Sequence, residues 1–322
     1  MRKTTLIWLI VAASLLMLGI IIFGGVMTVL KWDFAKLSTT KYETNTHQID
    51  GNYSGISVVS DTADITLLPS EDGTTSVVCY EDSKQKHEVG VKDGTLTVER
   101  KNNKKWYDYI GINFGSAKIT VYLPEGEYSS LTVKESTGDI EVSKEFGFES
   151  IDISTSTGNV KSLACAKSSI KISTSTGAID VEGVSAGALD LSVSTGKVTV
   201  LDVSAERDIS IKVSTGKASL SGVTCKSLTS SGSTGDISMK NVIASEKLSI
   251  ERSTGKVTFE KCDAAEIFVE TDTGNVIGTL LSEKVFITES DTGNINVPSS
   301  ITGGRCEIKT DTGDIKISIV SE

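Results

Sequence analysis

The sequence predicts an all-β protein: a parallel β-solenoid of about ten rungs of 19–20 residues, with irregular N-terminal rungs and one transmembrane helix before it. Three observations support this fold class. A Thr-Gly pair recurs ten times at intervals of 19 or 20 residues, apolar and polar residues alternate on both sides of each Gly, and a long uncharged run opens the chain. A unit this short cannot bury its own apolar face, so the units must stack on one another.

A membrane-spanning helix is predicted for the run from Thr4 to Leu30, which holds 27 residues and no charge. As a helix it would be about 40 Å long, enough to cross a hydrocarbon core of about 30 Å. Arg2 and Lys3 precede it, which favours a cytoplasmic N-terminus and an extracytoplasmic C-terminal part. A cleaved signal peptide is the alternative, but the run is long for one and no small-x-small cleavage site closes it. We therefore expect a single-pass anchor in the cell membrane.

These features divide the chain into five predicted parts. They are a cytoplasmic N-terminus (1–3), the transmembrane anchor (4–30), a linker (31–50), an irregular β region or cap (51–130) and the regular array (131–322).

The irregular region is strand-like but does not keep the repeat. Residues 61–65 read Asp-Thr-Ala-Asp-Ile, a degenerate copy of the turn with Ala in place of Gly, so the coil should begin before the regular array. Residues 89–100 are predicted to form a hairpin around Asp93-Gly94, and residues 117–123 an alternating strand. Irregular end rungs are expected, because an open end exposes unpaired backbone that must be covered.

In the regular array, the residues flanking each Gly repeat with the Gly. The position seven residues before Gly is apolar in all ten units: Leu131, Ile151, Ile170, Leu189, Ile209, Leu228, Leu248, Ile267, Phe286 and Cys306. Two residues later, eight of ten are aliphatic, the exceptions being Ser230 and Thr288. A meander of hairpins would not make equivalent strands neighbours, whereas a coil stacks them in parallel about 4.8 Å apart. The coil is therefore favoured, with each Gly supplying a positive φ at a corner where a Cβ would clash.

The five cysteines suggest no disulfide framework and no metal-binding spacing. Cys165 and Cys262 each follow a repeat Gly by seven residues and should occupy equivalent interior positions five rungs apart. We expect mostly buried free thiols that act as small apolar residues.

One segment of the irregular region concentrates basic and aromatic side chains, and it supplies the candidate binding residues Lys104, Lys105, Trp106, Tyr107 and Tyr109. Such a loop could contact glycan, lipid headgroups or a protein partner through its aromatic rings and ammonium groups. The alternative is a cap that lies over the end of the coil.

A second candidate site lies in the last three units, where Asp272, Asp291 and Asp311 precede Thr-Gly and Asp314 follows the last Gly. If the units stack, these carboxylates form an oxygen-rich ladder of the kind that suits Ca²⁺. The alternative is ordinary hydrogen bonding of Asp within a turn. No other cofactor is implied.

Catalysis finds little support in the sequence. The two histidines, His47 and His87, lie outside the array and in no recognisable nucleophile or metal motif, so we expect no enzyme. A polysaccharide-active β-helix enzyme that uses the Asp ladder is the less favoured alternative. The net charge of −10 argues against nucleic acid as a partner.

The repeat units resemble a known family. Residues 135–140 (Glu-Ser-Thr-Gly-Asp-Ile), 155–160 and 271–276, together with the anchor and the Lys-Lys-Trp insertion, are similar to the bacterial "putative adhesin" family, also called the Toastrack or LiaG-like β-strand-repeat domain. The likeness covers roughly residues 45–322. It implies a right-handed solenoid at the cell envelope, a link with envelope stress and no catalytic residues. Here Lys197, and Lys at two other post-Gly positions, depart from the acidic pattern.

Together these features predict a membrane-anchored extracytoplasmic solenoid that acts as an interaction or adhesion surface, or as a cell-envelope-stress accessory. Cell-wall glycan or envelope proteins are the expected partners, besides the membrane itself. The alternative from another functional class is a passive structural spacer.

Overall fold

A computed structural model describes residues 3–37, 40–101 and 115–320 of the chain. It contains one α-helix, one short 3-10 helix (Phe34–Leu37) and a set of strands that form a single extended sheet system. The elements are α1 (Lys3–Val29), β1 (Tyr42–Ile49), β2 (Gly55–Val59), β3 (Ala63–Pro69), β4 (Thr75–Asp82), β5 (His87–Lys92), β6 (Thr95–Arg100), β7 (Ala117–Leu123), β8 (Gly126–Thr137), β9 (Ile140–Val142), β10 (Phe146–Thr157), β11 (Val160–Ser162), β12 (Cys165–Glu182), β13 (Ser185–Ala186), β14 (Leu189–Ala205), β15 (Asp208–Thr234), β16 (Ile237–Thr254), β17 (Val257–Thr273), β18 (Val276–Leu280), β19 (Lys284–Thr292), β20 (Ile295–Asn296), β21 (Gly304–Thr312) and β22 (Ile315–Ile319).

Helix α1 is the apolar segment expected at the N-terminus. Its stretch Thr4–Val29 has a mean hydropathy of 2.9 and is long and apolar enough to cross a membrane. These properties fit a membrane anchor or a signal sequence. The direction in which it crosses stays a prediction.

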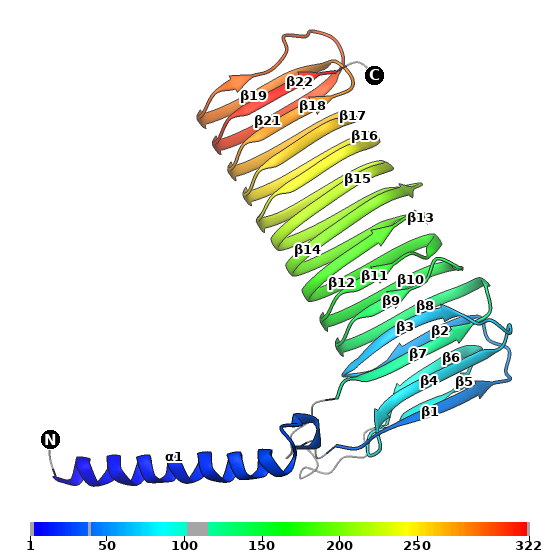
Figure 1. Ribbon diagram of the computed structural model, residues 1–322. Coiled ribbons are helices and arrows are strands. Elements are labelled where there is room, and N and C mark those ends of the chain that lie inside the picture. The colour runs from blue at the N-terminus through cyan, green and yellow to red at the C-terminus, as the bar shows by residue number, and fades with distance from the viewer. Residues whose placement is uncertain (1–2, 38–39, 102–114, 321–322) are drawn as a thin grey trace.

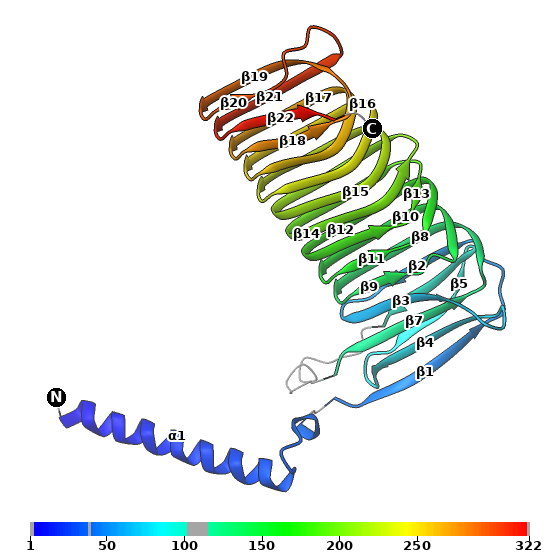
Figure 2. The same cartoon turned by 45° about the horizontal axis from the view of Figure 1, so that its top comes forward.

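The body is a β-solenoid of about ten turns, as the repeat predicts. Equivalent strands of successive rungs pair in parallel and in register: Ile151 pairs with Ile170, Ile170 with Leu189, and Leu189 with Ile209. Their side chains point inward and are at most 1% exposed, so each apolar position of the repeat forms a continuous interior ladder. Figure 2 shows the rungs stacked side by side along one axis. The coil is confirmed, and the meander is excluded.

The repeat Gly marks a corner that no other residue fits. Gly216 has a φ of 138°, and a Cβ built on it would lie 1.6 Å from the carbonyl oxygen of Gly196 in the preceding rung. The corner backbone is bonded between rungs as well, because Gly158 N donates to Thr176 O at 2.9 Å. The absence of a side chain therefore lets successive corners stack closely.

The N-terminal end is a cap that includes antiparallel strands. Its strands do not lie next to one another in the order of the sequence. Strands β2 and β3 form the first rung, in parallel contact with β8 and β9, and the Thr62–Thr137 bridge aligns Ala63 with the first repeat Gly. The degenerate turn is thus a true corner, as predicted. Beyond this rung, β7, β4 and β1 extend one face and β6 and β5 the other (Figure 1).

Two predictions for this region are confirmed. Strands β5 and β6 form the expected hairpin, with Asp93 at φ 50° and Gly94 at φ 73° in its turn. The expected strand at residues 117–123 is β7, which pairs with both β3 and β4.

The C-terminal end also departs from chain order. Strand β17 pairs in parallel with β21, not with β19, and β21 in turn pairs with β19. On the other face β22 lies between β18 and β20. The last unit of the chain therefore lies between the rung of β17 and β18 and the unit that precedes it in sequence, and β19 with β20 forms the outermost rung (Figure 2).

The prediction for Cys165 is wrong. Ala164 takes the interior position, at 0% exposure, and Cys165 is half-buried with its Sγ accepting the N–H of Ser185 at 3.3 Å. The rung is one residue out of step there, because the interior position follows its Gly by six residues rather than seven. Cys262 is buried as expected, and all five cysteines are free thiols. Burial raises the pKa of Cys79, Cys225 and Cys306 to about 12.

Candidate functional site

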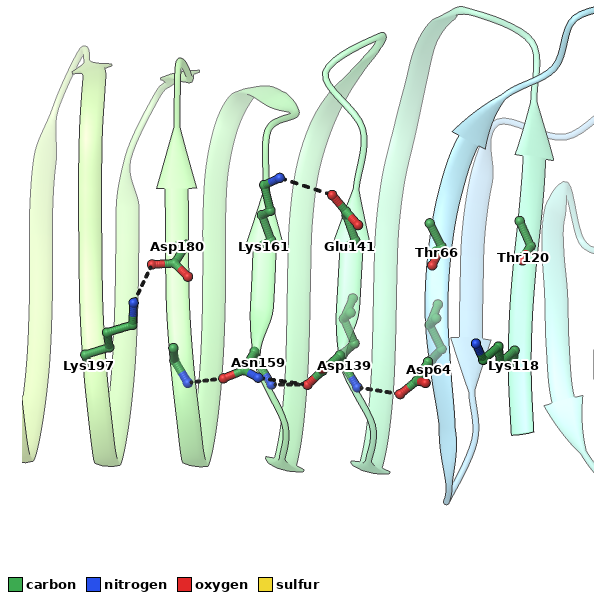
Figure 3. A pocket seen from close by; sticks show the side chains of 13 residues that line it. Asp64, Thr66, Lys118, Thr120, Asp139, Glu141, Asn159, Lys161, Asp180 and Lys197 are labelled. Atoms are coloured by element: carbon green, nitrogen blue, oxygen red, sulfur yellow. Dashed lines mark hydrogen bonds and ion pairs between the residues drawn. The ribbon is translucent and has the colours of Figure 1, made fainter. Parts of the chain in front are cut away.

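A polar groove crosses the face formed by the strands that follow each corner (Figure 3). It has a volume of about 610 Å³ and runs from the cap strand β7 over β3, β9, β11 and β12 to β14. Outward side chains at the first and third positions after each corner line it, because alternate residues of a strand point to the same face. The polar side chains are Asp64, Thr66, Lys118, Thr120, Asp139, Glu141, Asn159, Lys161, Asp180 and Lys197.

The floor of the groove is fixed by a ladder of hydrogen bonds between rungs. Asp64 Oδ1 accepts the backbone N–H of Asp139 at 3.1 Å, and Asp139 Oδ1 accepts that of Asn159 at 2.7 Å. Asn159 Oδ1 accepts the backbone N–H of Ala178 at 3.0 Å. The Asp or Asn that follows a Gly thus accepts a hydrogen bond from the backbone of the next rung. This bond explains why Asp and Asn recur at this position of the repeat.

Charges of both signs alternate along the wall of the groove. Lys161 Nζ lies 3.2 Å from Glu141 Oε1, and Lys197 Nζ lies 3.7 Å from Asp180 Oδ1. With Lys118 included, three ammonium groups and four carboxylates line the groove. Each partner of these pairs is about half exposed, so the pairs contribute little to stability and can exchange for a ligand's polar groups.

The predicted Asp ladder exists in a different spatial order. Register places Asp311 between Asp272 and Asp291, because the last unit of the chain is the middle one of the three. All three side chains are exposed. Asp314 has a local role in addition, since its Oδ1 accepts the N–H of Asn294 at 2.8 Å. The carboxylates do not converge on one point: in the part of the chain that the structure describes, the one set of three convergent ligand groups lies in the cap. Calcium binding at this ladder stays a prediction.

The other candidate residues, Lys104, Lys105, Trp106, Tyr107 and Tyr109, lie outside the described residues. Their binding role stays a prediction as well.

The groove was not predicted from the sequence, although part of its signal was there. The residue after the repeat Gly is polar in nine of the ten units, Ala178 being the exception, and its outward direction follows from the alternation of a strand. The sequence does not show that Asp64 and Lys118 line the same groove. They lie on β3 and β7 of the irregular region, and the pairing of these strands does not follow the repeat.

Comparison with solved structures finds chains that are similar to this one at low sequence identity. The "putative adhesin" of Bacteroides fragilis NCTC 9343 is 17% identical, with 86% of this chain and 97% of that chain covered and a TM-score of 0.44. A "putative adhesin" of Parabacteroides distasonis ATCC 8503 is 12% identical, with 87% and 98% covered and a TM-score of 0.49. A "putative lipid binding protein" of the same organism is 17% identical, with 87% and 98% covered and a TM-score of 0.46.

No curated protein matches the sequence. The family model described as Toastrack DUF4097 matches residues 53–209 and again residues 201–322, which together include every strand from β2 to β22. The chain belongs to the Toastrack family.

Proposed function

We propose that this chain is a membrane-anchored, extracytoplasmic adhesion or interaction module that binds cell-wall glycan along the polar groove. The observation that carries the proposal is the row of outward Asp, Asn, Glu and Lys side chains, repeated from rung to rung on a rigid face. Each rung offers a few weak contacts about 4.8 Å from the next, and the stacked backbone aligns them.

The chemistry of the groove favours a neutral or zwitterionic glycan over a polyanion. Carboxylates and ammonium groups alternate along its wall, so neither sign dominates. Carboxylate and amide oxygens accept from sugar hydroxyls, and ammonium groups donate to them. Among the described residues no aromatic ring lines the groove, so these residues would bind through many polar contacts rather than through ring stacking.

The test uses the full chain in lipid nanodiscs, presented to purified peptidoglycan and to a neutral cell-wall polysaccharide. We expect the double variant Lys161→Ala/Asp180→Ala to lose at least tenfold in retention, because it removes a groove contact from each of two rungs. Lys226→Ala is the matched control: Lys226 forms an ion pair of the same length, 3.2 Å, with Glu246 outside the groove and with similar exposure.

If the wild-type chain binds neither glycan, the result would favour the alternative of a passive structural spacer. Equal loss in the control variant would mean that binding does not depend on the groove. The finer role as an envelope-stress accessory rests on the family resemblance alone, and loss of a stress response on deletion of the gene would support it.

A further inference from the structure

Three buried side chains with metal-binding atoms converge in the N-terminal cap. Cys79 and Glu81 point inward from β4, and His87 begins β5, the neighbouring strand along the chain. They are 0%, 1% and 6% exposed, and their sulfur, oxygen and nitrogen ligand atoms all lie within 4.8 Å of one another. This group is independent of the polar groove and of the Asp ladder.

Hydrogen bonds hold the histidine and the carboxylate in place. His87 Nδ1 lies 2.6 Å from Glu81 Oε2, and Ser60 Oγ lies 3.1 Å from His87 Nε2 on the other side of the ring. Asn45 Nδ2 donates to Glu81 Oε1 at 2.7 Å. When Nε2 carries the ring proton and donates to Ser60, the lone pair of Nδ1 faces Glu81. Such an outer partner is what orients a metal-binding histidine in proteins.

From this geometry we infer that the cap holds a zinc-class divalent ion, bound by Cys79 Sγ, Glu81 Oε2 and His87 Nδ1. Thiolate, carboxylate and imidazole are the ligands that Zn²⁺ prefers, at about 2.0 to 2.3 Å. A thiolate and a carboxylate together carry two negative charges, so they neutralise the ion inside a site that excludes water. Ser60 is only 5% exposed, which leaves no space for an organic substrate beside His87 but does not hinder a single ion.

A second observation comes from His47 on the adjacent strand, which is not one of the residues whose ligand atoms lie within 4.8 Å of one another. His47 of β1 lies opposite Val77, two residues along β4 from Cys79, and therefore on the same inner face of the sheet. Its Nε2 is buried and has no hydrogen-bond partner. Buried polar nitrogens are nearly always paired, so an unpaired one on the face that also carries Cys79 is a second, independent sign of a missing partner.

Binding is an exchange of protons for the ion. The proton between His87 Nδ1 and Glu81 Oε2 and the proton of the Cys79 thiol leave, and bonds from nitrogen, oxygen and sulfur to the ion replace them. No oxidant or reductant takes part. One ion should therefore release about two protons, with an affinity that rises with pH.

The experiment titrates the full chain in detergent with Zn²⁺ and with Co²⁺. We expect one ion per chain, a thiolate-to-cobalt charge-transfer band and a higher melting temperature on Zn²⁺ binding. Cys79→Ser and His87→Ala should each weaken binding at least tenfold. Cys306→Ser is the matched control, because Cys306 is also a 0% exposed thiol, at the opposite end of the solenoid, and should leave binding unchanged.

X-ray absorption of the zinc-loaded wild-type chain keeps the test decisive if a variant does not fold. One sulfur and one or more imidazole ligands would support the site. Absence of binding, oxygen-only coordination, or unchanged affinity in folded Cys79→Ser and His87→Ala chains would overturn it.

Discussion

Arg252 carries a charged group into the interior of the solenoid, where it is 2% exposed. Its Nη2 donates to Ser230 Oγ at 2.8 Å, and its Nε has no partner. Gly232 makes room for the guanidinium, since a Cβ there would lie 2.1 Å from Nη1. Burial lowers the pKa of Arg252, because removal from water disfavours the charged form. Ser230, one of the two polar residues at its interior position of the repeat, therefore has a partner one rung away.

Glu135 is a second buried ionisable group, and it makes stability depend on pH. It is 6% exposed, and burial raises its pKa to about 7. The unfolded chain loses this proton near pH 4.5 while the folded chain keeps it until about pH 7. Its contribution is therefore complete below pH 4.5 and is lost as the pH rises to 7. We expect the difference in unfolding free energy between wild type and Glu135→Gln to change by about 2 to 3 kcal/mol between pH 4.5 and 7.5.

Urea unfolding of the full chain in detergent at a series of pH values measures this difference. Glu149→Gln, at an exposed position four residues into the next rung's strand, should show the pH profile of wild type. A Glu135→Gln chain with an unchanged pH profile would contradict the assignment.

At the scale of the strand pair, the residue after each Gly decides how firmly neighbouring corners are joined. Asn159 accepts the N–H of Ala178, whereas Ala178 and Lys217 offer no such acceptor to the next rung. We expect Asn159→Ala to lower the unfolding free energy by about 1 kcal/mol, the usual net value of one hydrogen bond. Lys217→Ala should change it by less than about 0.5 kcal/mol, as is normal for an exposed residue. Equal effects of the two changes, measured by chemical unfolding, would show that the ladder is not stabilising.

The elements that follow the repeat could be predicted from the sequence, and the elements that break it could not. Apolar alternation around each Gly predicts strand, corner and inward face from local information, and the coil follows because one position stays apolar in every unit. The stacking order of the last units cannot be predicted from this alternation. The units ending at Thr292 and Thr312 carry the same Thr-Gly signature, so either could stack on β17. Thr288 gives a hint, because it is polar at an interior position and belongs to the outermost, more exposed rung.

The candidate sites, too, could be predicted only in part from the sequence. The post-Gly row of the groove follows from the period, but its continuation onto β3 and β7 depends on long-range pairing. The convergence of Cys79, Glu81 and His87 depends on it too. Alternate positions on one strand place Cys79 and Glu81 on the same face, yet nothing local reveals that His87 returns to meet them.

For the whole molecule, nearest-neighbour stacking predicts that one complete rung can be removed. Deletion of residues 197–216 joins Gly196 to Lys217, and Gly196 and Gly216 already occupy equivalent places in register. We expect this chain to fold with β-rich circular dichroism and a melting temperature lowered by only a few degrees, because each rung contacts only its neighbours. Deletion of residues 197–206 alone should prevent cooperative folding, because it leaves half a rung and shifts every later inward position. Failure of both deletions would show that the solenoid depends on contacts beyond adjacent rungs.

The inverted order of the final units has a consequence for how the protein is made. Residues 284–292 leave the ribosome before residues 304–312, yet their only ladder partner is β21. The backbone groups of β19 therefore stay exposed to water or to a chaperone during synthesis. They are paired only when β21 has been made and has bound to β17. Stacking in chain order extends as far as β18, which pairs with β17, whereas the distal end closes only after β21 has been made.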